Sequence, residues 1–324
     1  MSRSLVVSTA LIASVALGGC AALDDKSSED YPDRAITVIF PFAAGSPGDV
    51  NVRALAKEVE PELGQSLEIV NKDGAAGTAG MNEVASAKND GYTAAFTPIA
   101  PLTIQPQISD LNYDDIDDFE PVIGTSTTPQ VLSVAADSPY KTLEDLIAAG
   151  KKSTLKLSTT GRGTILDVDA SLLAKESGAS FSNVAFEGEQ QALGALVGGT
   201  TDLAVSGTTA AMPFEKSGDI RVLGVFSDEK LEVFPDAPTV PSLGYDITFA
   251  VDNFVLLPAG TDPAVVDTLH DAFKKGVDSD GYTKFLEENG YVKQYLDPDE
   301  VEKHIADQYE QYSTVIEDLG LDEQ

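Results

Sequence analysis

The chain has 324 residues, of which 42% are hydrophobic, and this is enough for sizeable buried cores. Its 53 acidic and 21 basic residues give a formal net charge of -32 at pH 7, which argues against a nucleic-acid partner because phosphate binding requires clustered Lys and Arg. The acidic excess grows after Leu296, where ten Asp or Glu accompany one Lys. We interpret it as a solvated surface that suits a saline medium, in which salt screens self-repulsion.

The N-terminus has the pattern of a bacterial lipoprotein signal. Residues 1–4 carry one positive charge, residues 5–17 are apolar or small, and Leu17-Gly-Gly-Cys20 follows. This resembles a lipobox, so residues 1–19 are expected to be a signal peptide and residues 20–30 a tether lipidated at Cys20, the only cysteine. The protein would then be extracytoplasmic and lipid-anchored to the cell membrane. A plain secretory signal with an incidental cysteine is the alternative.

Strand-like and helix-like segments then alternate, which indicates an α/β fold with mostly parallel sheets. We expect strands at residues 36–40, 67–71, 93–97, 131–135, 155–158, 184–186, 202–205, 221–226 and 254–257. We expect helices at residues 52–63, 81–87, 143–149, 165–173, 190–197, 264–277 and 298–319.

The first strand leads into a loop that suits an anion. Pro41 ends the strand, residues 43–48 are small, and a helix follows. The unpaired N–H groups of a first helical turn and the helix dipole both favour a carboxylate or phosphate. The alternative is an ordinary loop in which Gly45 and Gly48 serve only for turning.

Catalysis is not expected from this sequence. The two histidines, His270 and His304, lie outside the glycine loops, and no thiol remains beyond Cys20, so Ser–His and thiol chemistry lack their residues. The acidic residues 114–118 lack the glycine and distal glutamate of a calcium loop, and we interpret them as a polar turn. We therefore predict no cofactor and no metal.

Many short motifs follow one another along the chain, and their order together is specific enough to indicate a family. They are Tyr31-Pro32, Pro41-Phe42, Gly45, Asp49, Leu63-Gly-Gln65, Asp90-Gly-Tyr-Thr93, Ser138-Pro-Tyr-Lys141, Gly161-x-Gly163-Thr164 and Pro258-Ala-Gly-Thr261. With them the chain resembles the substrate-binding proteins of tripartite tricarboxylate transporters, the Bug-type extracytoplasmic solute receptors. The resemblance runs from Tyr31 to the C-terminal helix.

The resemblance implies a periplasmic-binding-protein-like fold with a ligand cleft between two domains. Domain 1 would comprise residues 31–125 plus 251–324, and domain 2 residues 126–250, with hinges near residues 124–133 and 244–253. The partners would be a small carboxylate and separate membrane subunits of the transporter. A monomer is expected.

The resemblance also implies the binding residues. In this family the first loop holds a carboxylate through backbone N–H groups and ordered water, and a second small-residue loop holds the other end of the solute. The implied residues are Phe42, Ala43, Ala44, Gly45, Ser46, Gly48, Asp49 and Thr97 in domain 1, and Thr159, Thr160, Gly161, Arg162, Gly163, Thr164, Glu187 and Gly188 in domain 2.

Several positions depart from the family pattern. Ser46 replaces a glycine, Asp167 a histidine, and Glu187 a lysine, while Asp252-Asn253 stands where a tryptophan is common. The added carboxylates disfavour a tricarboxylate. We therefore predict a mono- or dicarboxylate, including one with an amine that Glu187 or Asp167 would meet.

Two questions stay open at this point. Arg162 is either a partner for an anion or a solvated loop residue. The function is either that of a transporter receptor or that of one of three alternatives: a receptor that presents its ligand to a sensor kinase, a binding protein of another transporter type, or a secreted enzyme.

Overall fold

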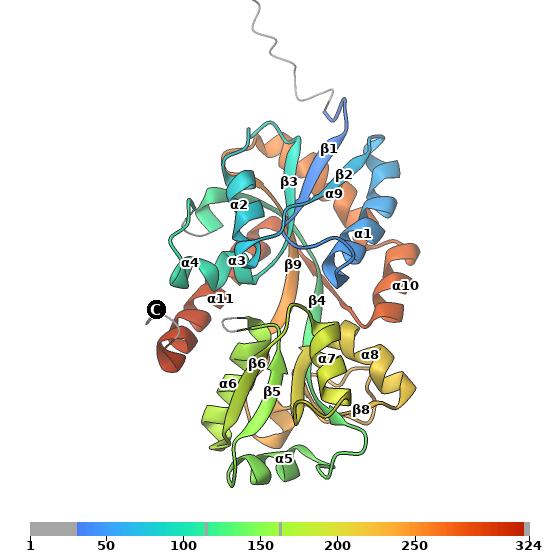
Figure 1. Cartoon of the computed structure of the whole chain (residues 1–324). Coiled ribbons are helices and arrows are strands. Elements are labelled where there is room, and N and C mark those ends of the chain that lie inside the picture. Colours follow the sequence, from blue (N-terminus) through green and yellow to red (C-terminus); the bar gives the residue numbers. More distant parts are fainter. Residues whose placement is uncertain (1–30, 114–115, 162–163, 321–324) are drawn as a thin grey trace, which may run out of the picture.

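The computed structural model describes residues 31–113, 116–161 and 164–320 (Figure 1). The predicted signal peptide, the lipidation site Cys20, and Arg162 and Gly163 lie outside these residues. Within the described part of the chain, no helix has the length and apolar character that a membrane crossing requires.

The chain forms two lobes, one above the other in Figure 1. The upper lobe contains β1 (Ile36–Phe40), α1 (Pro47–Leu63), β2 (Leu67–Asn71), η2 (Ala75–Gly77), α2 (Thr78–Ala85), β3 (Thr93–Pro98), α3 (Ala100–Thr103), α4 (Gln105–Ile108), η3 (Ile116–Asp118), α9 (Pro263–Val277), α10 (Asp280–Asn289), β10 (Val292–Leu296) and α11 (Pro298–Leu319). The lower lobe contains α5 (Leu143–Gly150), β5 (Leu155–Thr159), α6 (Ile165–Ser177), β6 (Phe181–Ala185), α7 (Glu189–Val197), β7 (Leu203–Gly207), α8 (Thr208–Ser217), β8 (Ile220–Phe226) and η4 (Pro241–Leu243).

Two long strands, β4 (Phe119–Ala135) and β9 (Ala250–Pro258), connect the lobes. The first residues of β4 pair with β9, as in Phe119 opposite Pro258, and its last residues pair with β7 and β8. The lobes therefore share one continuous strand. The exact domain boundaries expected from the sequence remain a prediction.

The α/β fold class is confirmed, but the sheet is mixed rather than mostly parallel. Its strand order is β2-β1-β3-β9-β4-β7-β5-β6, and β8 and β10 each pair with β4. The pairs β1–β2, β1–β3, β5–β6 and β5–β7 are parallel, whereas every pair that involves β4 or β9 is antiparallel. The reason is that β4 leads the chain into the lower lobe and β9 leads it back.

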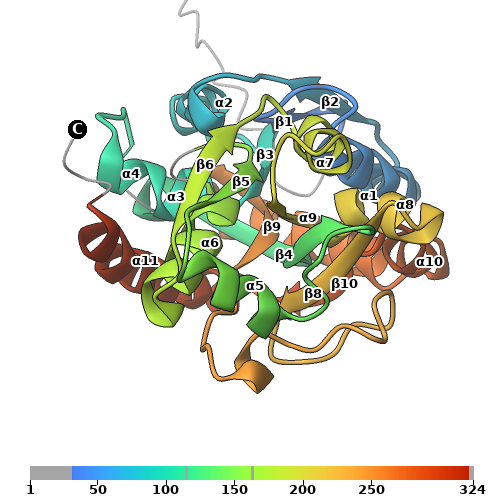
Figure 2. The same cartoon turned by 60° about the horizontal axis from the view of Figure 1, so that its bottom comes forward.

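Three apolar clusters support this arrangement. One packs α1 against α9 in the upper lobe through Leu55, Val59 and Phe273, and another lies under α7 and α8. The third extends between the lobes and includes Ile305 of α11, a helix that contacts both α3 and α6 and lies beside α6 in Figure 2. The C-terminal helix thus packs on both lobes.

Candidate ligand-binding cleft

A cavity of about 260 Å³ lies between the lobes and is lined by residues of both. Its lining comprises Phe40, Phe42, Ser46, Pro47, Gly48, Ala76, Pro98, Ala100, Gln105, Thr128, Gln130, Thr160, Thr164, Ile165, Leu166, Glu189, Gly207, Thr209, Val251, Asn253 and Tyr291. This volume lies just below the usual range of about 300–1,000 Å³ for ligand pockets and suits a small solute. A second cavity, of about 580 Å³, is lined by none of the residues that the sequence predicted for the site.

The N-terminus of α1 opens into this cleft. Ser46 is the N-cap residue with φ -68° and ψ 161°, and Pro47 occupies the first turn, where its missing N–H costs nothing. The Ser46 Oγ atom is buried and has no hydrogen-bond partner among the described residues. Because the first N–H groups of a helix have no intrahelical partner, this end of α1 offers donors and a positive dipole to an anion.

Phe40 sits closely against this helical turn. A Cβ atom on Gly48 would lie 2.5 Å from Phe40 Cζ, so only glycine fits this position without displacing the ring. Phe40 and Phe42 both line the cavity, with ring centroids 5.8 Å apart. The end of the cleft at α1 thus has an apolar wall beside it.

Asp49 fixes the shape of the first loop. Its carboxylate accepts hydrogen bonds from Gly45 N at 2.8 Å and from Asn71 Nδ2 at 2.9 Å, and it forms an ion pair with Arg53 Nη2 at 2.9 Å. Burial disfavours its charge, but the hydrogen bonds from Arg53, Gly45 and Asn71 outweigh burial and lower the Asp49 pKa below 3.8. Asp49 itself does not line the cavity, nor do Ala43, Ala44 and Gly45.

The second predicted loop also reaches the cleft. Thr160 and Thr164 line it, whereas Thr159 points elsewhere and donates to Asn183 Oδ1 at 2.8 Å. Thr164 caps α6 by accepting from Asp167 N at 3.4 Å, and it donates to Gly161 O at 2.8 Å. Gly161 does not line the cavity.

Other predicted residues lie away from the cavity. Thr97 is buried and donates to Pro98 O at 3.0 Å. Glu187 is exposed, and Gly188 is the N-cap residue of α7. Asp167 is buried and accepts from Asn183 Nδ2 at 2.6 Å. None of these four lines the cleft, so the amine contact predicted for Glu187 or Asp167 does not have its residues in place.

The acidic side chain that lines the cleft is Glu189, the first residue of α7. Its Oε2 atom accepts from Gly207 N at 2.5 Å. Burial raises the Glu189 pKa, against the opposing effect of the Gly207 hydrogen bond. Glu189 was not predicted from the sequence, because it lies between a family motif and an expected helix.

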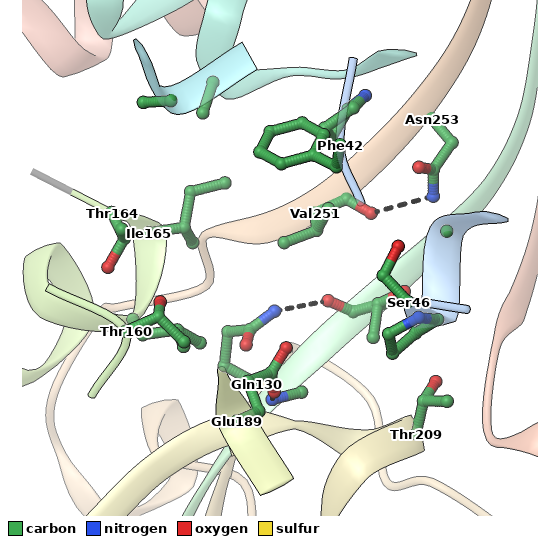
Figure 3. A pocket seen from close by; sticks show the side chains of 18 of the residues that line it. Phe42, Ser46, Gln130, Thr160, Thr164, Ile165, Glu189, Thr209, Val251 and Asn253 are labelled. Atoms are coloured by element: carbon green, nitrogen blue, oxygen red, sulfur yellow. Dashed lines mark hydrogen bonds between the residues drawn. The ribbon is translucent and has the colours of Figure 1, made fainter. Parts of the chain in front are cut away.

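Further polar residues of the cleft were also missed, among them Gln130, Asn253 and Tyr291. Gln130 is fully buried in β4, Asn253 lies in β9, and the Tyr291 hydroxyl donates to Pro47 O at 2.8 Å. In Figure 3, Gln130 and Glu189 lie in the lower part of the view, between Ser46 on one side and Thr160 on the other. Buried Gln and Asn in apolar strands are the signal that identifies such positions.

The described lining holds no Lys, Arg or His. Within residues 31–113, 116–161 and 164–320, no group of three or more His, Cys, Asp or Glu side chains is placed to hold a metal ion. An anion in this cleft therefore meets helix N–H groups, hydroxyls and side-chain amides as the donors that the structure describes.

Comparison with known protein families shows which family this chain belongs to. A family model, the tripartite tricarboxylate transporter family receptor TctC, matches residues 51–321. The chain belongs to the TctC family. The members of the TctC family are binding receptors, so the expectation that this chain is not an enzyme is confirmed.

Individual relatives cover nearly the whole chain. A protein of Cupriavidus necator, named UPF0065 protein in gbd 5'region, is 31% identical over 322 residues, which is 98% of each chain. The structure of R. palustris Rpa4515 with adipate has a TM-score of 0.82 at 26% identity and covers 90% of this chain and 99% of that one. The structure of MatC from Rhodopseudomonas palustris with bound malate has a TM-score of 0.77 at 25% identity. The match covers 88% of this chain and 100% of the MatC chain.

Proposed function

We propose that the protein is an extracytoplasmic receptor that captures a small mono- or dicarboxylate and delivers it to the membrane subunits of a tripartite tricarboxylate-type transporter. The observation that carries this proposal is the N-terminus of α1, which opens into the cleft beside the Ser46 hydroxyl, a group with no partner in the described part of the chain. The two similar structures that contain adipate and malate support a carboxylate as cargo.

The cleft would recognise its ligand with both lobes at once. The carboxylate would accept hydrogen bonds from the first turn of α1 and from Ser46, while Thr160 and Thr164 of the lower lobe would meet the other end. A ligand that contacts both lobes favours the closed arrangement over the open one, and the membrane subunits would sense this difference. The long strands β4 and β9, which connect the lobes, would bend during closure.

Attachment to the membrane belongs to the same proposal. Lipidation at Cys20 would keep the receptor beside its transporter after removal of residues 1–19. The test is cell fractionation of the full chain and a Cys20→Ala variant. The wild type is expected in the membrane fraction and the variant in the soluble extracytoplasmic fraction, and equal distribution of the two would contradict lipid anchoring.

The carboxylate requirement is tested by dye-monitored thermal melts, because the chain has no Trp to report closure. Mono- and dicarboxylates are compared with their matched amides, which keep the shape but lose the charge. A ligand at 100 times its Kd stabilises the folded state by about 2.7 kcal/mol, so a specific acid should raise the Tm by several degrees and its amide should not. Equal shifts for acid and amide, or none with any carboxylate, would contradict the proposal.

A further inference from the structure

Two oxygen acceptors meet in one part of the cleft. A Cβ atom built on Gly207 would lie 3.3 Å from Glu189 Oε2 and 3.8 Å from Gln130 Oε1, so both side chains approach the same point. Both residues line the cavity, and Figure 3 shows them together. This wall comes from β4, the start of α7 and the end of β7, whereas the end proposed to bind the carboxylate is built on α1.

The orientation of the Gln130 amide is fixed by its neighbour. Its Nε2 atom donates to Thr128 O at 2.7 Å, and a carbonyl oxygen only accepts, so the oxygen must be the other end of the amide. Gln130 is fully buried, and its Oε1 atom has no hydrogen-bond partner among the described residues. A buried acceptor of this kind requires a donor that the described protein atoms do not supply.

Glu189 adds a carboxylate to this acceptor. One of its oxygens accepts from Gly207 N, and the described cavity lining holds no cationic side chain to neutralise it. The Tyr291 hydroxyl, which also lines the cleft, already donates to Pro47 O at 2.8 Å. The position of Glu189 in the first turn of α7 places its charge where the helix dipole favours it.

We propose that Gln130 and Glu189 recognise a protonated amine, so that the cargo is an amino carboxylate. This inference rests on the proposed function and makes its ligand class specific. The carboxylate of the ligand lies at the N-terminus of α1. The ammonium group of the same ligand donates to Gln130 Oε1 and to the Glu189 carboxylate. An ammonium group brings three donors and no acceptor, which complements this wall. A second carboxylate in the same place would meet acceptors and a like charge.

The test is isothermal titration calorimetry at pH 7 with matched ligand pairs that differ by one amine. Suitable pairs are alanine and propionate, 4-aminobutanoate and butanoate, and glutamate and glutarate. The wild type is expected to bind one amino form at least tenfold more tightly than its des-amino partner.

The Glu189→Gln variant removes the charge but keeps an oxygen that accepts from Gly207 N, and a thermal melt confirms that it folds. It is expected to lose at least tenfold in affinity for the amino carboxylate and none for the des-amino acid. Glu176→Gln, which makes the same charge change at an exposed site on α6, is expected to leave both affinities unchanged.

Four outcomes would overturn the inference. A preference for the des-amino acids, or an amine preference that survives in Glu189→Gln, would exclude the amine site and leave the carboxylate receptor intact. Preferential binding of dicarboxylates that strengthens at low pH would instead indicate a protonated Glu189 that donates to a second carboxylate. The absence of binding by every carboxylate, with or without an amine, would overturn the proposed function as well.

Discussion

Asp49 illustrates how one side chain shapes a loop at the cleft without lining the cavity itself. Its carboxylate holds Gly45, Arg53 and Asn71 together, and Asn71 in turn donates to Phe42 O at 3.0 Å. The loop that leads to Ser46 is therefore fixed before any ligand arrives. Such preorganisation reduces the entropy lost on binding.

Replacement of this carboxylate should destabilise the protein in a pH-dependent way. The Asp49 pKa is lowered in the folded state, so its stabilising effect is present above the unfolded value of 3.8 and is lost as the pH falls through the folded pKa. We expect Asp49→Asn to cost about 1–3 kcal/mol in urea unfolding at pH 7, because Gly45, Arg53 and Asn71 lose a charged acceptor, and less below pH 3.8. Asp73→Asn, at an exposed position, is the control, and an equal effect of the two variants would contradict this role.

Asp169 on α6 should have the opposite pH dependence. It is fully buried, both carboxylate oxygens lack partners among the described residues, and burial raises its pKa well above 3.8. A raised folded-state pKa means that stability is lost as the pH rises from the unfolded value toward the folded one. The titratable group beside it is Tyr312, which also interacts with Asp252, a carboxylate that pairs with His304 Nε2 at 2.8 Å.

We therefore expect the unfolding free energy of the wild type to fall between pH 4 and pH 8 by more than that of Asp169→Asn. The difference should be about 1 kcal/mol or more, since a tenfold difference in proton affinity between the folded and unfolded states corresponds to about 1.4 kcal/mol. Urea unfolding at both pH values measures it. Parallel pH profiles for the two proteins would show that Asp169 does not titrate differently on folding.

At the scale of elements, the close packing of α1 against α9 determines whether a glycine in the interface can be replaced by alanine. A Cβ on Gly276 of α9 would overlap with Val59 Cγ2 of α1, whereas a Cβ on Gly194 of α7 would meet nothing within 4 Å. Both glycines are helical, so both substitutions to alanine gain helix propensity. Only the first creates a clash.

The expected results therefore differ in sign. Gly276→Ala should destabilise the protein by about 1–3 kcal/mol through overpacking, and Gly194→Ala should stabilise it by about 0.5–1 kcal/mol. Thermal or urea unfolding of the two single variants provides the comparison. If both variants gain stability, the close approach of α1 and α9 is wrong.

The local sequence pattern predicted the exact first and last residues of some helices and strands. β1, β2 and α11 have the expected bounds, since each is a run of β-formers or an amphipathic helix with clear ends, and α11 starts with a capping box between Asp297 and Glu300. β4 was expected only at residues 131–135, because the polar residues 125–128 and Pro129 conceal a strand that is buried almost throughout. Its burial depends on β9, more than a hundred residues away in the chain.

The residues of the site also divide into those that local sequence predicts and those that only tertiary structure brings together. Ser46, Gly48, Thr160 and Thr164 were predicted because they belong to loops with a readable composition, and they do line the cleft. Glu189 and Gln130 were not predicted, because only the folding of α7 and β4 around Gly207 places them together. Local composition therefore indicated the two loops that line the cleft, whereas the positions of Gln130 and Glu189 depend on tertiary structure.

For the molecule as a whole, the net charge of -32 sets the response to salt. The Debye length falls from about 30 Å at 0.01 M to about 10 Å at 0.1 M salt, so repulsion between surface carboxylates is progressively screened. We expect the Tm to rise by several degrees over this range in sodium chloride. A Tm that stays flat or falls would show that self-repulsion does not limit the stability.

In the proposed function, the N-terminus of α1 is the element that recognises the ligand carboxylate. Ser46 permits a direct test, because Asp and Asn are both good N-cap residues and neither should impair folding. Ser46→Asp places a negative charge where the carboxylate would bind, whereas Ser46→Asn has nearly the same shape without the charge.

The decisive measurement is the calorimetric affinity of both variants for the carboxylate that stabilises the wild type most. We predict that Ser46→Asp binds it at least tenfold more weakly than Ser46→Asn, equivalent to about 1.4 kcal/mol, while both variants melt at or above the wild-type Tm. Equal affinities in the two variants would place the carboxylate elsewhere and contradict recognition by α1.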